Sequence, residues 1–67
     1  MDIKQKLIEL RKDKKLTQKK VAELLGMSAT GYASWEQGLA EPNLEAIRKL
    51  CNIYNVPADY ILGIKDY

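Results

Sequence analysis

Length, composition and charge already exclude several classes of protein. The chain has 67 residues, which we expect to form one domain, residues 1–67, with a small core. Cys51 is the only cysteine and histidine is absent, which excludes an internal disulfide, a zinc site of cysteine and histidine ligands, and a catalytic histidine. The net charge is +2, and no apolar run approaches the roughly 18 residues of a membrane-spanning helix.

Helical spacing of apolar residues, together with residues that cap helices, predicts an all-α chain. Thr17, Ser28 and Asn43 are expected N-caps, because their side-chain oxygens can accept from a free backbone N–H. Gly26 is expected to end a helix in the left-handed conformation, and Pro57 to open the last one. Short loops then give a compact bundle of five helices, over residues 2–13, 18–25, 29–37, 44–54 and 57–62.

The predicted helices also suggest an orientation for their side chains. Asp2 suits the positive end of the first helix. In the fourth helix the inner face is expected to hold Leu44, Ile47, Leu50, Cys51 and Tyr54. In the last segment the residues expected to point inward are Ile61, Leu62 and Ile64.

Residues 18–37 have the pattern of two helices that meet at a sharp corner. Ala22 is small where the second helix must cross closely, and Gly26 follows four residues later at the corner. Apolar residues stand where both helices must face one core: Val21, Leu25, Met27, Tyr32 and Trp35. This pattern predicts a helix-turn-helix, whose second helix enters the major groove of DNA.

The same stretch carries a family resemblance, which extends over residues 3–63. Its motifs are Leu16-Thr17-Gln18, Val21-Ala22, Leu24, Gly26-Met27-Ser28, Trp35-Glu36, Gly38, Pro42, Leu44, Ile47, Leu50, Val56 and Ile61-Leu62-Gly63. In this combination they resemble the lambda-repressor-like family, also called the Cro or Xre type. The resemblance implies a five-helix DNA-binding domain with residues 29–37 as the recognition helix.

The resemblance also implies contacts to DNA phosphates. In the family a glutamine at the place of Gln18 binds a phosphate beside a helix N-terminus; the alternative is a solvent-exposed first-turn residue. The full set expected at phosphates is Thr17, Gln18, Lys19, Ser28 and Asn43. Lys19 and Lys20 oppose the helix dipole, so they either face phosphates or are ordinary exposed lysines. Glu41 stands where some relatives carry bases, which puts a backbone contact from that loop in doubt.

Base contacts are implied at Ala29, Thr30 and Ser34, where the sequence departs from better-known members of the family. Those members often carry glutamine, arginine or asparagine, which bind a base through two hydrogen bonds. Short side chains can instead contact a thymine methyl or form a single hydrogen bond. We therefore expect weaker or more shape-dependent recognition of sequence.

Other residues are interpreted as structural. Arg11 and Glu36 match a pair that forms an ion pair in the family, joining the first helix to the end of the third. Tyr32 and Trp35 are three residues apart and are expected in the core rather than as stacking platforms for bases. Cys51 is expected as a packed small hydrophobe. Ile53 and Tyr60 are the apolar residues least explained by inward packing, and we expect them in a homodimer contact through the C-terminal helices.

The leading function is a sequence-specific regulator of transcription, a repressor, that binds two half-sites of double-stranded operator DNA as a dimer. Residues 1–20 hold eight basic and three acidic residues, which is compatible with a polyanion partner. The alternative, which charge alone favours, is a solvated lysine-rich helix face. The alternative is a protein-interaction module, such as an antitoxin or a partner of a regulator. Nothing in the sequence indicates an enzyme, a cofactor, a small-molecule ligand or a membrane partner. The lone cysteine and the N-terminus without an apolar signal predict a cytoplasmic location.

Overall fold

The computed structural model describes residues 3–64 and confirms the all-α fold. Its five helices are α1 (Ile3–Asp13), α2 (Gln18–Leu25), α3 (Ala29–Glu36), α4 (Leu44–Tyr54) and α5 (Ala58–Leu62). The expected start of α1 at residue 2, and with it Asp2, lies outside the described residues. Two boundaries differ by one residue, because Gln37 is the C-cap of α3 and Pro57 is the N-cap of α5. Within residues 3–64 no helix has the length and apolar character needed to cross a bilayer.

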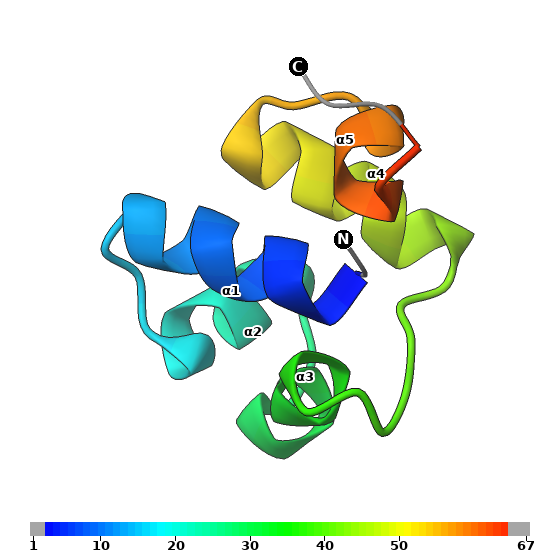
Figure 1. The fold of residues 1–67 in the computed structure, drawn as a ribbon. Helices are drawn as coiled ribbons and strands as arrows, with labels where there is room; N and C mark the ends of the chain where they lie inside the picture. Colours follow the sequence, from blue (N-terminus) through cyan, green and yellow to red (C-terminus); the bar gives the residue numbers. More distant parts are fainter. Residues whose placement is uncertain (1–2, 65–67) are drawn as a thin grey trace.

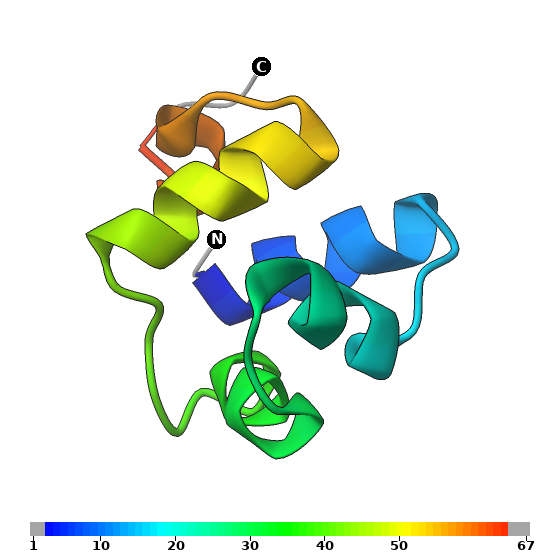
Figure 2. The same ribbon diagram turned by 180° about the vertical axis from the view of Figure 1, so that it is seen from behind.

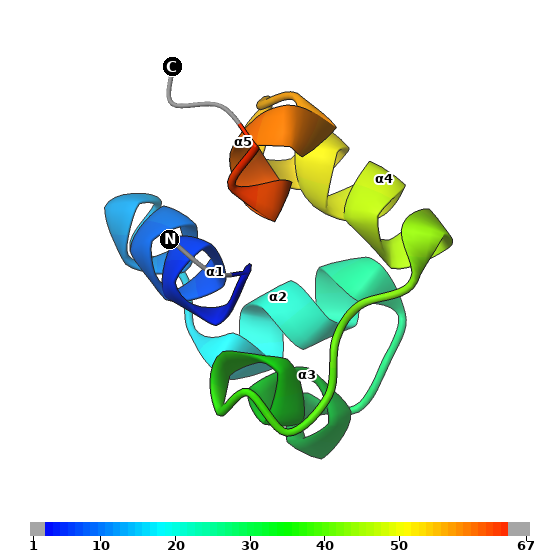
Figure 3. The same cartoon turned by 45° about the vertical axis from the view of Figure 1, so that its right-hand side comes forward.

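Helix α1 packs between α3 and α5. It contacts α3 on one side and α5 on the other (Figures 1 and 3). Helix α2 packs against α3 and α4, and in Figure 2 α4 lies above it. Lys49 of α4 strengthens this contact, since its Nζ donates to the Leu25 carbonyl at the end of α2, 3.3 Å away. The corner formed by α2 and α3 is therefore supported from behind by α1 and α4.

All three predicted caps are confirmed. The Thr17 hydroxyl oxygen accepts from the Lys20 N–H at 3.0 Å, and the Ser28 hydroxyl oxygen from the Gly31 N–H at the same distance. The amide oxygen of Asn43 accepts from the N–H of the third residue of α4 at 2.8 Å. Each cap satisfies one backbone donor that the helix itself leaves free, and so fixes where its helix begins.

The core connects all five helices, but three residues expected in it are exposed. Its largest fully buried side chains are Leu7, Val21, Tyr32, Leu50 and Ile61. By contrast Leu44 is 67% exposed, Leu62 41% and Ile64 67%. Leu44 begins α4 at the end of a loop, away from the centre. Helix α5 has only five residues, of which Ile61 is buried and Ala58 packs against the core, and Gly63 turns the chain away before Ile64.

Gly26 occupies the conformation that the corner requires. Its φ is +75°, and its N–H bonds to the carbonyls of the last turn of α2. A Cβ added at Gly26 would meet no atom within 4 Å, so the cost of a side chain there is conformational and not steric. We expect Gly26→Ala to lower the free energy of unfolding by about 1–2 kcal/mol, the usual penalty for a left-handed L-residue. Urea unfolding followed by Trp35 fluorescence measures this, and an unchanged midpoint would contradict it.

Candidate nucleic-acid interface

The turn between α2 and α3 has the close packing that a helix-turn-helix requires. Ala22 is buried where the two helices cross, and its carbonyl accepts from the Met27 N–H at 3.0 Å. On the inner side of α3, Tyr32 is fully buried and packs edge-on against Trp35, with ring centroids 5.8 Å apart. Trp35 is half-buried and packs on the same core. Because these residues hold α3 by one face, its other face is presented to solvent.

The outer face of α3 carries the residues expected at base edges. Ala29 and Thr30 are exposed, while Ser34 is half-buried and its hydroxyl donates to the Gly31 carbonyl at 2.6 Å. The Ser34 oxygen can therefore still accept a hydrogen bond but has no proton left to donate. This outer face continues to Gln37, which is exposed and lies seven residues after Thr30. The sequence analysis did not include Gln37 among the expected DNA contacts. The spacing of seven could have identified it, and its amide is the longest polar group of this face.

Gly31 leaves room at the start of α3. A Cβ at this position would lie 3.1 Å from the Ser28 hydroxyl oxygen and 3.2 Å from the Met27 methyl carbon. A glycine inside a helix is unfavourable by propensity. Here it lets the capping hydroxyl and the methionine side chain approach the helix together.

A cluster of polar side chains connects α1, the start of α2 and the end of α3. Arg11 Nε donates to Glu36 Oε2 at 2.7 Å and Arg11 Nη2 to Glu36 Oε1 at 3.1 Å, so the ion pair is bidentate. The third guanidinium nitrogen donates to the Leu16 carbonyl at 2.9 Å. Gln18 Nε2 donates to Glu36 Oε1 at 3.0 Å. The side chains of Arg11 and Glu36 are only 15% and 4% exposed.

The contact with Glu36 gives Gln18 a structural role beside the phosphate contact that the resemblance implies. Its side-chain amide is directed at the cluster and is half-buried, although Gln18 is the first residue of α2. The backbone N–H of Gln18, which no helical carbonyl can reach, and the second proton of its side-chain amide are the donors left for a phosphate at this position. Gln18 thus holds α2 against α3 in addition to any role at DNA.

The cluster sets the charge state of Glu36. Burial alone would raise the pKa of the Glu36 carboxyl, but the hydrogen bonds from Arg11 and Gln18 outweigh it and the pKa is lowered. The hydrogen bond to Glu36 raises the pKa of Arg11 against a smaller opposing effect of burial. Burial, and next the neighbouring carboxylate, raise the pKa of the Tyr32 hydroxyl. Glu36 is therefore ionised in the folded protein at neutral pH.

The lowered pKa of Glu36 predicts how stability changes with pH. Since the folded protein binds this proton less tightly than the unfolded chain, whose glutamates titrate near pH ~4.3, the carboxylate stabilises the fold above that pH. This contribution is lost as the pH falls. We expect the urea midpoint to fall on acidification from pH 7 to about 3, and to fall less in Glu36→Gln. Equal acid sensitivity in the two proteins would contradict this assignment.

The other expected phosphate contacts line the rim of the α2–α3 corner and the start of α4. Thr17, Ser28 and Asn43 use their side-chain oxygens as acceptors in the caps, which leaves the two hydroxyl protons and the Asn43 amide protons to donate to a phosphate. Lys19 is exposed beside Thr17. Each of these donors stands at a helix N-terminus, where the helix dipole also favours an anion.

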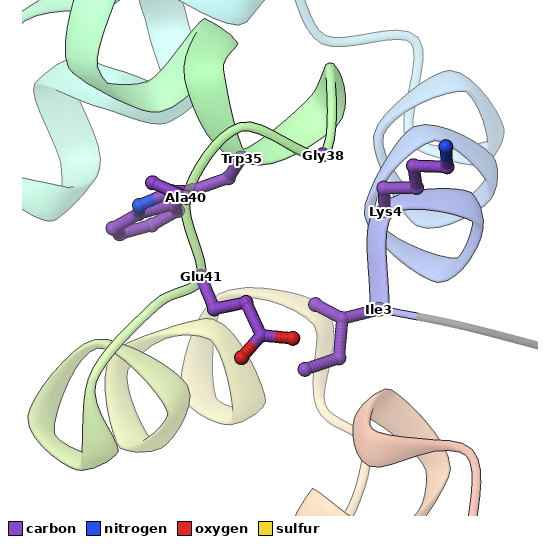
Figure 4. A pocket seen from close by; sticks show the side chains of 6 residues that line it. All are labelled: Ile3, Lys4, Trp35, Gly38, Ala40 and Glu41. Carbon is purple, nitrogen blue, oxygen red and sulfur yellow. The ribbon is translucent and has the colours of Figure 1, made fainter.

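The loop between α3 and α4 offers DNA no positive charge. Residues 37–43 contain no lysine or arginine. Beside the loop is a hollow of about 150 Å³, and Figure 4 shows the Glu41 carboxylate directed across it toward Ile3 at the start of α1. The aliphatic part of the Lys4 side chain packs against Gly38. Its Cδ lies 3.1 Å from the place that a Cβ at Gly38 would occupy. The composition of this loop therefore does not favour contacts from it to the DNA backbone.

The residues expected at a dimer contact have partners within the chain. Ile53 is half-buried and packs against the core. Tyr60 is half-buried, and its ring receives the Nζ of Lys6, 4.0 Å from the ring centroid. The exposed apolar side chains of this region are Leu62 and Ile64. Cys51 packs against the core as expected, and burial raises the pKa of its thiol.

Comparison with known proteins agrees with this geometry. A family model described as helix-turn-helix matches residues 7–61. The chain is 39% identical over 62 residues to the uncharacterized HTH-type transcriptional regulator YobD of Bacillus subtilis, covering 92% of this chain and 55% of YobD. It is 37% identical to the HTH-type transcriptional activator BcrR of Enterococcus faecalis, covering 94% of this chain and 31% of BcrR. It is 36% identical to the cryptic phage CTXphi transcriptional repressor RstR of Vibrio cholerae, covering 78% and 47%.

A solved structure shows the same fold. The crystal structure of a transcriptional regulator from Listeria innocua superposes with a TM-score of 0.90, at 23% identity, over 98% of this chain and 62% of that one. The chain spans about half the length of YobD and less than a third of BcrR. The similarity therefore concerns the domain described above and not the remainder of those proteins.

Proposed function

The chain belongs to the Cro/Xre-type helix-turn-helix family, and from this premise we propose that it is a sequence-specific, double-stranded DNA-binding regulator of transcription. The observation that carries the proposal is the exposed outer face of α3, with capped helix N-termini beside it. A helix held by its inner face and bordered by N–H and O–H donors matches the docking of a recognition helix in the major groove. In this proposal the protein acts in the cytoplasm, where the DNA it would regulate lies.

In this proposal α3 reads bases and the capped helix ends hold the backbone. Ala29 and the Thr30 methyl contact thymine methyl groups, while Ser34 accepts a hydrogen bond from a base. Thr17, Lys19, Ser28 and Asn43, with the backbone N–H of Gln18, bind phosphates. Most of the affinity then comes from phosphates and falls steeply with salt. The family relation points to regulation of transcription and not to catalysis.

We further propose a homodimer that represses. Leu62 and Ile64 extend the region of Ile53 and Tyr60 as an exposed apolar edge beside α5, and a two-fold contact there would present two copies of α3 to successive major grooves. Repression needs only occupancy of DNA that polymerase must reach, which this domain can provide. Activation, the function printed in the name of BcrR, would need an additional contact to polymerase.

A protein-interaction module remains the second candidate, since two large exposed leucines beside α3 favour it. Leu39 is 78% exposed and Leu44 67% exposed, at the two ends of the loop that follows α3. Large exposed leucines close to a recognition surface suit a protein partner. The short side chains of α3 also make few contacts that select a base.

Selection from a random duplex DNA library at about 150 mM salt tests the proposed function, because that salt suppresses non-specific binding. We expect enrichment of an inverted repeat with half-sites one helical turn apart. Enrichment of a single half-site would refute the dimer but not DNA recognition. No enrichment, with capture of a specific protein that Leu39→Ser and Leu44→Ser release, would favour the interaction module.

A further inference from the structure

We propose that five lysines around the α1–α2 turn form a second contact surface for duplex DNA, one that binds phosphates flanking the site read by α3. This basic corner consists of Lys12, Lys14, Lys15, Lys19 and Lys20. The inference rests on the proposed function and extends it, since Lys19 alone belongs to the contacts expected at the α2 N-terminus. It assigns the corner to the DNA backbone irrespective of sequence.

The corner is positively charged, and its lysine side chains have no partner within the described part of the chain. All five lysines are exposed, and the stretch from Lys12 to Lys20 contains a single acidic residue, Asp13. Among residues 3–64 other lysines do find partners: Lys49 binds the Leu25 carbonyl, and Lys6 lies over the Tyr60 ring. None of the five corner side chains makes an ion pair or a hydrogen bond within the described part of the chain. Their ammonium groups are available to a polyanion.

Folding accounts for only some of these charges. Lys12, Lys14 and Lys15 stand at the negative end of α1, which favours cations, but Lys19 and Lys20 stand in the first turn of α2, where they oppose the helix dipole. Lys15 has a φ of +58°, in the left-handed region that glycine adopts most easily. Its N–H and the next one close the end of α1 on the carbonyls of Lys12 and Arg11. The turn therefore keeps a long charged side chain at a position where the backbone favours none.

The position of the corner suits flanking phosphates. It continues directly from the capped N-terminus of α2 and projects at the edge of the molecule, at the blue-to-cyan connection in Figure 1. On the other side of α3, residues 37–43 contain no lysine or arginine, and Glu41 adds a negative charge. Positive charge beside the recognition helix is thus concentrated on the α2 side. A duplex lying along α3 would extend past this corner.

Substitutions at Lys15 separate the proposal from a structural role. Lys15→Gln keeps the strained backbone and removes the charge, whereas Lys15→Gly removes both. We expect Lys15→Gly to raise the melting temperature and Lys15→Gln to leave it nearly unchanged. Both should reduce the slope of log K against log salt by about 0.9, the amount for one phosphate contact. A combined Lys14→Gln, Lys15→Gln, Lys20→Gln variant should reduce it by about 2–3.

The measurement is fluorescence anisotropy of the full 67-residue chain with the selected duplex and with an unrelated duplex of equal length, over a series of salt concentrations. The variants should weaken binding to both duplexes by the same factor, leaving their ratio unchanged. Arg48 is an exposed basic residue on α4, and Arg48→Gln is the matched control. It should leave the slope of log K against log salt unaltered. Normal binding with unchanged slopes in the lysine variants overturns the corner alone. A wild-type chain that binds neither duplex overturns both the corner and the proposed function.

Discussion

Replacing Glu36 by alanine is expected to lower the free energy of unfolding by about 3–5 kcal/mol. The Arg11 guanidinium, which is 15% exposed, would lose both bonds of its bidentate pair and stay largely buried. The Gln18 amide would lose its acceptor as well. A small domain has about 5–15 kcal/mol of stability in total, so the variant should lie close to unfolding at 37 °C.

A double-mutant cycle measures this pair. Urea unfolding of Arg11→Ala, Glu36→Ala and the double variant should show that the second substitution costs much less once the first is present. Glu23→Ala, at an exposed carboxylate on α2, is the control and should stay within about 0.5 kcal/mol of the wild type. A loss below about 1 kcal/mol for Glu36→Ala would mean that the pair behaves as a surface ion pair.

Ala29→Glu is expected to abolish DNA binding while leaving the fold intact. Ala29 is exposed and is the first residue of α3, where a carboxylate favours the helix dipole. In the proposed complex the same carboxylate would stand in the major groove between two phosphate backbones. Like charges at an interface cost several kcal/mol, so affinity should fall at least about 100-fold, with a melting temperature equal to or above that of the wild type.

Ala29→Gln is the matched control for this prediction. It has nearly the size of glutamate without its charge, and its amide can pair with adenine. We expect it to bind duplex DNA with an altered base preference next to its position. If Ala29→Glu binds the selected duplex as well as the wild type does in the anisotropy assay, α3 does not lie in the groove.

Local signals explain why the helix boundaries could be predicted. Thr17, Ser28 and Asn43 act on N–H groups three residues away, and Gly26 acts on its own dihedral angles. Such effects depend on neighbours in sequence alone. The exposure of Leu44 and Leu62 could not be predicted in this way, because periodicity does not say how far a short helix extends beyond the core it contacts.

Long polar side chains were the least predictable part of the site. Gln18 is typical of an exposed first turn, yet it reaches Glu36, eighteen positions along the chain. Lys6 stands in a lysine-rich helix, where a solvated side chain is typical, yet it is buried over the ring of Tyr60 on α5. In both cases the partner comes from another helix, so the packing of α2 against α3 and of α1 against α5 determines the contact. The base contacts expected at Ala29, Thr30 and Ser34 stay predictions for the same reason, since their partner is another molecule.

The packing of α1 against both α3 and α5 bears on how the protein acquires activity during synthesis. The helix-turn-helix is complete in sequence by Glu36, but α1 also packs against α5, and Ile61 belongs to the same core as Leu7 and Tyr32. A small domain of this kind folds cooperatively. A nascent chain that has just exposed its recognition helix from the ribosome would therefore still lack the last part of its core. We expect DNA binding to appear only once Ile61 has emerged, so that a nascent chain that still lacks α5 cannot occupy an operator.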